Sequence, residues 1–261
     1  MFGPLDPTLL MVAHGTSVAG GEPARWLADC VRSSWNGPVH FGYMRSTPGL
    51  APVLEGLCET GLAHRLVVMP LFFSTGYLVQ TELPQRLHEA GLEDAGVLPP
   101  VIGLEGFKVM MVGQIRAVLN RQGWLAGDST VFLVPHGLKT LTEPLPETVV
   151  LAKALGSMIP EIDVQITNIE GQPSLTHWRT MSRRKQAVFL PMLAGGGVHA
   201  RDDVPEMIAA HDDEAVQVMK PVGTWAELPG LIVKQAQAID DLALRRKTSP
   251  HIHAPILSHM G

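Results

Sequence analysis

The sequence predicts an α/β protein of two similar lobes, each built on a four-stranded parallel sheet, with a cleft between the lobes. Three observations favour this fold class. Short apolar segments alternate with longer amphipathic ones, the two halves share motifs, and 261 residues suffice for two domains. One long doubly wound sheet is the alternative architecture for the same alternation.

Eight short apolar segments are the strand candidates. Each is bounded by turn residues, and a continuous apolar run is typical of a strand buried on both faces of a parallel sheet. They are Thr8–Ala13, Val39–Tyr43, Leu66–Leu71, Gly96–Leu98, Thr130–Pro135, Asp163–Ile169, Ala187–Met192 and Ala215–Met219. Apolar residues at three- and four-residue steps predict helices between them, over residues 49–64, 107–119, 149–158 and 231–242.

The two halves repeat one another in three motifs. LLMVAHGT resembles VFLVPHGL, LPPVIG resembles MKPVGT, and VVMPLFFSTGYLVQTELP resembles VFLPMLAGGGVHARDDVP. Matched positions lie 121 or 122 residues apart, as in His14 and His136 or Pro70 and Pro191. We therefore expect a first lobe over residues 1–124, a second lobe over 125–248 and a His-containing tail over 249–261.

Composition and motifs exclude several function classes. The net charge is -5 and no long run of Lys or Arg occurs, so a nucleic-acid partner is not expected. No apolar run approaches the roughly 20 residues that span a bilayer, and the N-terminus lacks signal-peptide features, so we expect a cytoplasmic protein without a membrane association. Walker and dinucleotide-binding motifs are absent. The two cysteines, Cys30 and Cys58, fall in apolar helical patterns and are expected to be buried.

Three side chains of the second half follow predicted strands. His136, Glu170 and His199 each come after the end of a strand candidate. Because the carboxyl ends of parallel strands open into one crevice, we expect these side chains to converge. Two imidazoles and a carboxylate suit a divalent metal such as cobalt or iron, or acid–base chemistry. Any one of the histidines alone would more simply be a surface or hydrogen-bonded residue.

The first half keeps only part of this set. Its first loop retains a histidine, His14. Counted from the shared prolines, Leu78 takes the place of the second histidine and Arg45 the place of the carboxylate. Since Arg45 would repel a cation, metal chemistry is expected in the second half. His14 either orders its loop by a hydrogen bond or takes part in binding.

The motifs PHG, ITNIEGQPSL and FLPMLAGGGVHARDDVP resemble the class II tetrapyrrole chelatases, which include cobaltochelatases of the anaerobic cobalamin pathway and sirohydrochlorin ferrochelatases. The resemblance covers nearly the whole chain. It implies insertion of a divalent metal, without nucleotide, into a tetrapyrrole bound between two α/β lobes. It also implies that His136 and His199 handle the metal with Glu170 as their partner. Because its histidine pair lies in the second half, the chain resembles the cobaltochelatase that works from its C-terminal lobe. Longer members of the other cobaltochelatase branch carry the intact pair in their first half, and this chain departs from them there, at Leu78 and Arg45.

From this resemblance we expect an ATP-independent metal chelatase, a lyase of cobalamin or siroheme biosynthesis. It would place Co²⁺ into sirohydrochlorin or a close precursor and need no cofactor beyond the substrate metal, Co²⁺ or Fe²⁺. A ferrochelatase for a siroheme- or heme-type product and a non-catalytic tetrapyrrole or metal carrier are the alternatives. A homo-oligomer is one option for its assembly.

Substrates of this kind carry eight carboxylates, so the acidic chain needs local cations to hold them. Arg201, beside the second histidine, is the first candidate, and Arg45 and His14 are candidates in the first half. Tyr77 would contribute to an apolar wall with Met44, Phe72 and Phe73, although core packing is the expected role of the two phenylalanines. A basic cluster forms a further candidate, with a solvated helix end as its alternative: Arg179, Arg183, Arg184 and Lys185.

Two acidic residues and a group of histidines complete the candidates. Asp202 and Asp203 are expected to cap the helix that follows them, with metal steering as the alternative. His251, His253 and His259 in the tail would collect metal ions unless the tail is simply an unstructured end.

Overall fold

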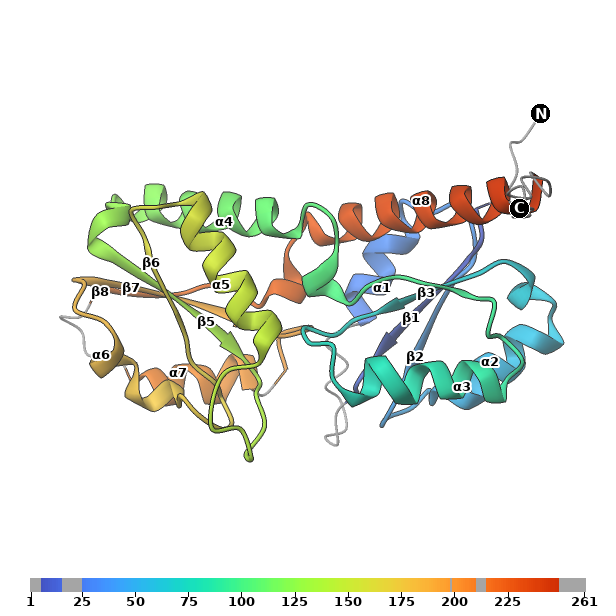
Figure 1. Cartoon of the computed structure of the whole chain (residues 1–261), viewed down its shortest axis with the longest axis horizontal. Helices are drawn as coiled ribbons and strands as arrows, with labels where there is room; N and C mark the ends of the chain where they lie inside the picture. Colours follow the sequence, from blue (N-terminus) through green and yellow to red (C-terminus); the bar gives the residue numbers. More distant parts are fainter. Residues whose placement is uncertain (1–5, 16–24, 198, 210–214, 249–261) are drawn as a thin grey trace, which may run out of the picture.

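The computed structural model describes residues 6–15, 25–197, 199–209 and 215–248, and side chains up to residue 239. The three tail histidines lie outside the described residues. Two four-stranded parallel sheets form the framework (Figure 1). The first sheet has the strand order β2-β1-β3-β4, and the second has the order β6-β5-β7-β8. The two orders are equivalent, because each strand of the second sheet corresponds to the strand four places earlier in the chain. The duplication predicted from the motifs is therefore confirmed, and a single long sheet is excluded.

All eight predicted strands are present, with small differences at their ends. The third ends one residue earlier than expected, at Pro70, and the sixth ends at Ile166. The strands are β1 (Thr8–Ala13), β2 (Val39–Tyr43), β3 (Leu66–Pro70), β4 (Gly96–Val97), β5 (Ser129–Pro135), β6 (Asp163–Ile166), β7 (Gln186–Met192) and β8 (Ala215–Val218). The register is duplicated as well: Leu9 pairs with Val67, and their counterparts Val131 and Val188 also pair.

The helices cover both faces of each sheet. They are α1 (Arg25–Arg32), α2 (Leu50–Glu59), α3 (Leu83–Glu89), α4 (Phe107–Gln122), α5 (Pro146–Met158), α6 (Trp178–Met181), α7 (Val204–Ile208) and α8 (Leu228–Thr248). Single 3-10 turns occupy Leu62–Arg65, Val101–Gly103, Ala126–Asp128, Leu175–His177 and Val222–Thr224. A π-helical turn precedes α3 at Leu78–Glu82 and another precedes α7 at His199–Asp203, so these turns are duplicated too.

Successive residues of the central strands bury opposite faces. In β1, Leu9 and Met11 enter one core, whereas Leu10 and Val12 enter another with residues of α2 and α3. In β5, Phe132 and Val134 pack with residues of α6 and α7. Each sheet is thus covered on both sides, which explains why its strands are continuously apolar in sequence.

The last helix of each half packs on the other lobe. Helix α8 follows the second sheet in sequence but lies against α1, β3 and β4 of the first lobe (Figure 1). Its Ile239 fills the space beside Gly96, 3.6 Å from where a Cβ would stand. Helix α4 lies over the second lobe, where Gln122 donates to Gln217 at 2.6 Å. The two sheets therefore share one large apolar core.

The two cysteines are less buried than expected. Cys30 is half-buried, and Cys58 is exposed on α2, with its Sγ 3.8 Å from the carbonyl oxygen of Ala90. The apolar pattern placed Cys58 on the core face, but it lies at the margin of that face, where α2 leaves it open to solvent. Within the described part of the chain, no helix has the length and apolarity to cross a membrane.

Candidate active site

Two histidines meet at the carboxyl ends of adjacent strands in the second lobe. His136 follows β5 directly, and His199 begins the π-helical turn after β7. Because β5 and β7 pair along their whole length, both loops open at the same edge of the sheet. The Nε2 atoms of the two imidazoles are 3.2 Å apart, and the ring planes are inclined by 83°. The structure thus brings together two of the three predicted ligands.

The other ring nitrogens fix which tautomer each histidine adopts. Nδ1 of His136 lies 3.0 Å from the carbonyl oxygen of Gly137, and Nδ1 of His199 lies 2.5 Å from Oδ2 of Asp203. A carbonyl or an ionised carboxylate can only accept, so in the neutral rings each Nδ1 carries the proton. Both Nε2 atoms then present lone pairs to the same space. Two nitrogens bound to one metal ion at 2.0–2.1 Å are separated by about 2.9–3.4 Å, which matches the observed spacing.

A tight loop holds the first of these histidines. Gly137 has φ +74°, and a Cβ on it would lie 2.1 Å from the carbonyl oxygen of Glu170, so only glycine fits there. The backbone N–H of Glu170 in turn donates to the carbonyl oxygen of His136 at 2.7 Å. The loops after β5 and β6 are therefore fastened to each other through their backbones.

The side chain of Glu170 does not join the histidine pair in this structure. Its Oε1 lies 3.9 Å from Nζ of Lys139, and its side chain is 31% exposed. Among the described residues, no three His, Cys, Asp or Glu side chains are grouped so as to hold a metal ion. The carboxylate associated with the histidines here is that of Asp203, and a metal-handling role for Glu170 stays a prediction.

The expected capping role of Asp202 and Asp203 is wrong. Asp203 makes no side-chain hydrogen bond to the start of α7, because the helical turn begins four residues earlier, at His199. Asp202 instead accepts two hydrogen bonds from Arg201, at 2.8 and 2.9 Å, which lower the pKa of Asp202 below its ordinary value while desolvation opposes them. The spacing of four residues between His199 and Asp203 was the signal that sequence reasoning missed.

The predicted substrate contacts are distributed over both lobes. Arg201 is 70% exposed and paired with its neighbour, Tyr77 is 65% exposed, and His14 repeats the local geometry of His136, with Nδ1 3.0 Å from the carbonyl oxygen of Gly15. Phe72 and Phe73 pack against the apolar cores, as expected. Contact of Arg201, Tyr77 and His14 with a substrate stays a prediction.

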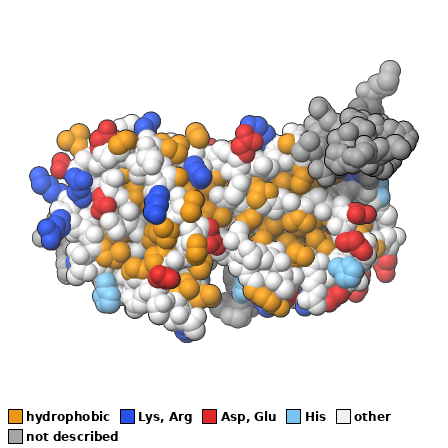
Figure 2. All heavy atoms as spheres, in the orientation of Figure 1, with side chains coloured by type: hydrophobic (Ala, Val, Ile, Leu, Met, Phe, Trp, Pro, Cys, Tyr) orange, Lys and Arg blue, Asp and Glu red, His pale blue; other side chains and the backbone are white. Residues whose placement is uncertain are grey.

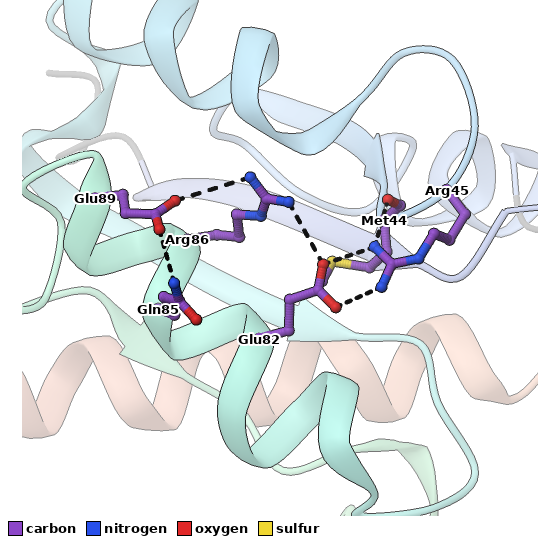
Figure 3. A network of polar contacts seen from close by, with 6 residues as sticks. All are labelled: Met44, Arg45, Glu82, Gln85, Arg86 and Glu89. Carbon is purple, nitrogen blue, oxygen red and sulfur yellow. Dashed lines mark hydrogen bonds and ion pairs between the residues drawn. The ribbon is translucent and has the colours of Figure 1, made fainter.

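The first-lobe counterpart of the site is occupied by an ion pair (Figure 3). Arg45, which replaces the carboxylate, donates through Nη1 and Nη2 to the two oxygens of Glu82, at 2.6 and 2.5 Å. Glu82 stands at the position of Asp203, two residues before the shared proline, and it also lies 3.6 Å from Arg86. Hydrogen bonds from Arg45 lower the pKa of this buried carboxyl, against the effect of its desolvation. Arg45 is thus engaged within the lobe.

The basic cluster lies at the wrong edge of the sheet to meet substrate at the histidines. Arg183, Arg184 and Lys185 precede β7, whereas His199 follows its carboxyl end; seven strand residues span about 20 Å. Lys and Arg side chains gather at this outer end of the second lobe in Figure 2. Arg179 is used structurally: it donates to the carbonyl oxygens of Ile208 and Ala209 and stacks on Trp178 at 4.5 Å. The solvated-end alternative therefore fits Arg183, Arg184 and Lys185, which are exposed, but not Arg179.

Comparison with known proteins finds one matching family model and several solved structures with similar folds. Residues 8–99, in the first lobe, match the CbiX family model. No curated protein matches the chain significantly. A solved structure described as CbiX, the terminal enzyme of siroheme biosynthesis in denitrifying bacteria, is similar with a TM-score of 0.71 and 22% identity, over 88% of this chain and 98% of that one.

Two further solved structures have similar folds. SirB from Bacillus subtilis with Fe³⁺ gives a TM-score of 0.70 at 15% identity, over 93% of this chain and 98% of that one. DR2241 from Deinococcus radiodurans, a multi-domain protein with structural similarity to chelatases, gives 0.65 at 20% identity, over 95% of this chain but 61% of that one. The predicted resemblance is thus confirmed: residues 8–99 match the CbiX family model, and the two lobes together have a fold similar to the solved CbiX and SirB structures.

Proposed function

We propose that this protein inserts a divalent metal ion, Co²⁺ or Fe²⁺, into sirohydrochlorin or a closely related tetrapyrrole, using a site in its second lobe. The observation that supports this most strongly is the pair of Nε2 atoms, 3.2 Å apart, in two imidazoles that each have an acceptor oxygen at Nδ1. The likeness to structures named for siroheme biosynthesis supports the substrate class. The choice between cobalt and iron follows from metal supply, because both ions accept the same nitrogen and oxygen ligands.

The chemistry exchanges two pyrrole protons for one metal ion. His136 and His199 hold the incoming ion through Nε2, and two protein ligands leave its other positions free for water and then for pyrrole nitrogens. Such a site binds the ion loosely enough to release it into the macrocycle. The carboxylate of Glu170, fastened beside His136 by its backbone, accepts one pyrrole proton in this proposal, and solvent water accepts the second. No nucleotide is required, consistent with the absence of a Walker motif.

An absorbance assay tests this proposal. Protein is mixed anaerobically with sirohydrochlorin and either Co²⁺ or Fe²⁺, and the spectral change of metal insertion is compared with the mixture lacking protein. We expect catalytic acceleration by the wild type. His136→Ala and His199→Ala are each expected to lower the rate at least about 10²-fold, the usual contribution of a positioned catalytic group. His88→Ala, at a side chain 75% exposed on α3, is the matched control and should retain the rate.

Two results would contradict the proposal. A wild-type rate equal to that of the free mixture with both metals would exclude catalysis and favour the carrier alternative, in which the spectrum changes only in proportion to protein. An unimpaired rate in His199→Ala would remove His199 from the mechanism.

A further inference from the structure

The carboxylate of Asp203 contacts the imidazole of His199, which faces His136. Its Oδ2 lies 2.5 Å from Nδ1 of His199, four residues away on the same π-helical turn. We propose that Asp203 is a positioning residue that holds His199 in its Nδ1–H tautomer and thereby aims the Nε2 lone pair at the metal position. This inference rests on the proposed function and names the residue that prepares its site.

The turn that carries Asp203 is anchored firmly enough to orient a ring. The next residue, Val204, is fully buried, and Ile208 one turn later is 1% exposed, both within the core between α7 and the second sheet. The side chain of Asp203 therefore starts from a fixed backbone. In contrast, the side chain of His199 is 48% exposed, so packing alone does not fix the orientation of its ring. The hydrogen bond from Nδ1 supplies the missing restraint.

The two histidines are restrained by different means. His136 donates to a backbone carbonyl, that of Gly137, which no side-chain substitution removes. Among the described residues, the partner of Nδ1 of His199 is the carboxylate of Asp203. If that carboxylate is replaced, the ring can carry its proton on Nε2 and donate it across the 3.2 Å gap to His136. The two nitrogens would then bond to each other and could not both bind one metal ion.

In the first lobe, the residue at the matching position orients a side chain of another type. Glu82, the counterpart of Asp203, lies on the matching π-helical turn and orients Arg45 through two hydrogen bonds (Figure 3). The acidic position thus fixes a nitrogen-bearing side chain at the carboxyl edge of each sheet. The neighbouring Asp202 has no such role, because both its oxygens face Arg201.

The test compares Asp203→Asn with Asp202→Asn, which removes the same charge one residue away. An amide can turn its N–H toward Nδ1, so Asp203→Asn is expected to shift His199 to the Nε2–H tautomer. Long-range ¹H–¹⁵N spectra of the metal-free protein, labelled at histidine and recorded at about pH 8.5 where an unperturbed imidazole is neutral, report this directly. His199→Ala and His136→Ala assign the resonances.

Metal binding provides the second readout. Co²⁺ alone is titrated into each variant and followed by its absorption spectrum. Asp203→Asn is expected to weaken Co²⁺ binding by about 10–100-fold, the usual effect of losing a hydrogen bond that orients a ligand histidine, and to lower kcat for insertion while KM for the tetrapyrrole is kept. Asp202→Asn should keep the wild-type tautomer and bind Co²⁺ with an affinity within about threefold of the wild type, a change expected at an exposed ion pair.

The inference fails if Asp203→Asn keeps the Nδ1–H tautomer, or if its Co²⁺ affinity equals that of Asp202→Asn. These outcomes are independent of turnover. A wild type that binds Co²⁺ but inserts none would overturn the proposed function and leave the role of Asp203 standing. If the wild type inserts metal and the Asp203→Asn variant behaves like the wild type, the proposed role of Asp203 is overturned while the proposed function stands.

Discussion

Glu170 is held in the site region by its backbone, while its carboxylate lies 3.9 Å from Nζ of Lys139. If it accepts a pyrrole proton, removing its charge should affect the chemical step more than metal binding. We expect Glu170→Gln to lower kcat for insertion by about 10²-fold, the lower range for a general base, with a smaller loss of Co²⁺ affinity than in His199→Ala. A loss of affinity as large as in His199→Ala would instead make Glu170 a metal ligand.

Glu82 makes the stability of the first lobe depend on pH. Its pKa is lowered, first by the hydrogen bond from Arg45, so its folded pKa lies below that of the unfolded chain. The pair therefore stabilises the fold fully above the ordinary carboxyl pKa of about 4.3, and this contribution is lost as pH falls through the lowered value.

Urea unfolding of Glu82→Gln as a function of pH checks this. The variant is expected to be less stable than the wild type at pH 7, and the difference should shrink as the pH falls below about 4.3. Glu89→Gln, at a side chain 51% exposed at the end of α3, is the matched control and should change stability little. A difference between Glu82→Gln and wild type that stays constant down to low pH would contradict the assignment.

At the scale of elements, the loop after β3 is fastened to helix α5 of the other lobe. Glu147, in the first turn of α5, accepts the backbone N–H of Thr75 at 2.8 Å and its hydroxyl at 3.3 Å. We expect Glu147→Ala to increase the hydrogen-exchange rate of the Thr75 amide about 10-fold or more. A hydrogen bond to a charged group contributes about 1.5–3 kcal/mol, and its loss makes opening of the amide more frequent by at least that factor. Glu143→Ala, in the exposed loop before α5, should leave it unchanged. Equal protection in both variants would show that this contact does not fasten the loop.

The strands could be predicted from sequence because each sheet is covered on both faces. Leu9–Val12 and Val131–Val134 are fully buried, so their apolar runs were unbroken and bounded by turn residues. The histidines were found for the related reason that residues following such strands share one edge of the sheet. These features are local in the chain, and the repeat reinforced each of them.

The remaining features depend on contacts between distant segments or on side-chain direction. The packing of α8 on the first lobe could not be predicted, because the periodicity of a helix indicates that it has an apolar face but not which surface this face contacts. The carboxylate of Glu170 was expected among the histidines from its position, but it lies 3.9 Å from Nζ of Lys139, and the described residues hold no group of three metal-ligating side chains. Asp203 was misassigned because the turn that contains it starts at His199 rather than after it.

At the scale of the whole molecule, the exchange of α4 and α8 makes the two lobes one structural unit. Glu227 accepts from Gln114 of α4 at 2.6 Å, and Gln235 of α8 accepts the backbone N–H of Glu105 at 2.8 Å. The sequence halves are therefore not separable bodies. The lobes keep one scaffold while their edges differ in chemistry: an imidazole pair in one, and a guanidinium–carboxylate pair in the other.

This asymmetry predicts the metal stoichiometry. In a chain ending at residue 248, which lacks the tail histidines, we expect one Co²⁺ per molecule, bound in the second lobe. The first lobe keeps His14, but the guanidinium of Arg45 places a fixed positive charge where a carboxylate stands in the other lobe, and Leu78 offers no ligand. Equilibrium dialysis with Co²⁺ measures the ratio, and His199→Ala should reduce it to near zero.

Restoring the missing groups should then create a second site. The variant that combines Arg45→Glu with Leu78→His gives the first lobe the same residue types as the second, on a backbone with the same strand order and the same π-helical turn. We expect it to bind two Co²⁺ per molecule. Leu78→His alone is the control, and it should remain at one because Arg45 still repels a cation. If circular dichroism shows the combined variant folded and its ratio stays at one, the difference between the lobes does not lie in these two positions.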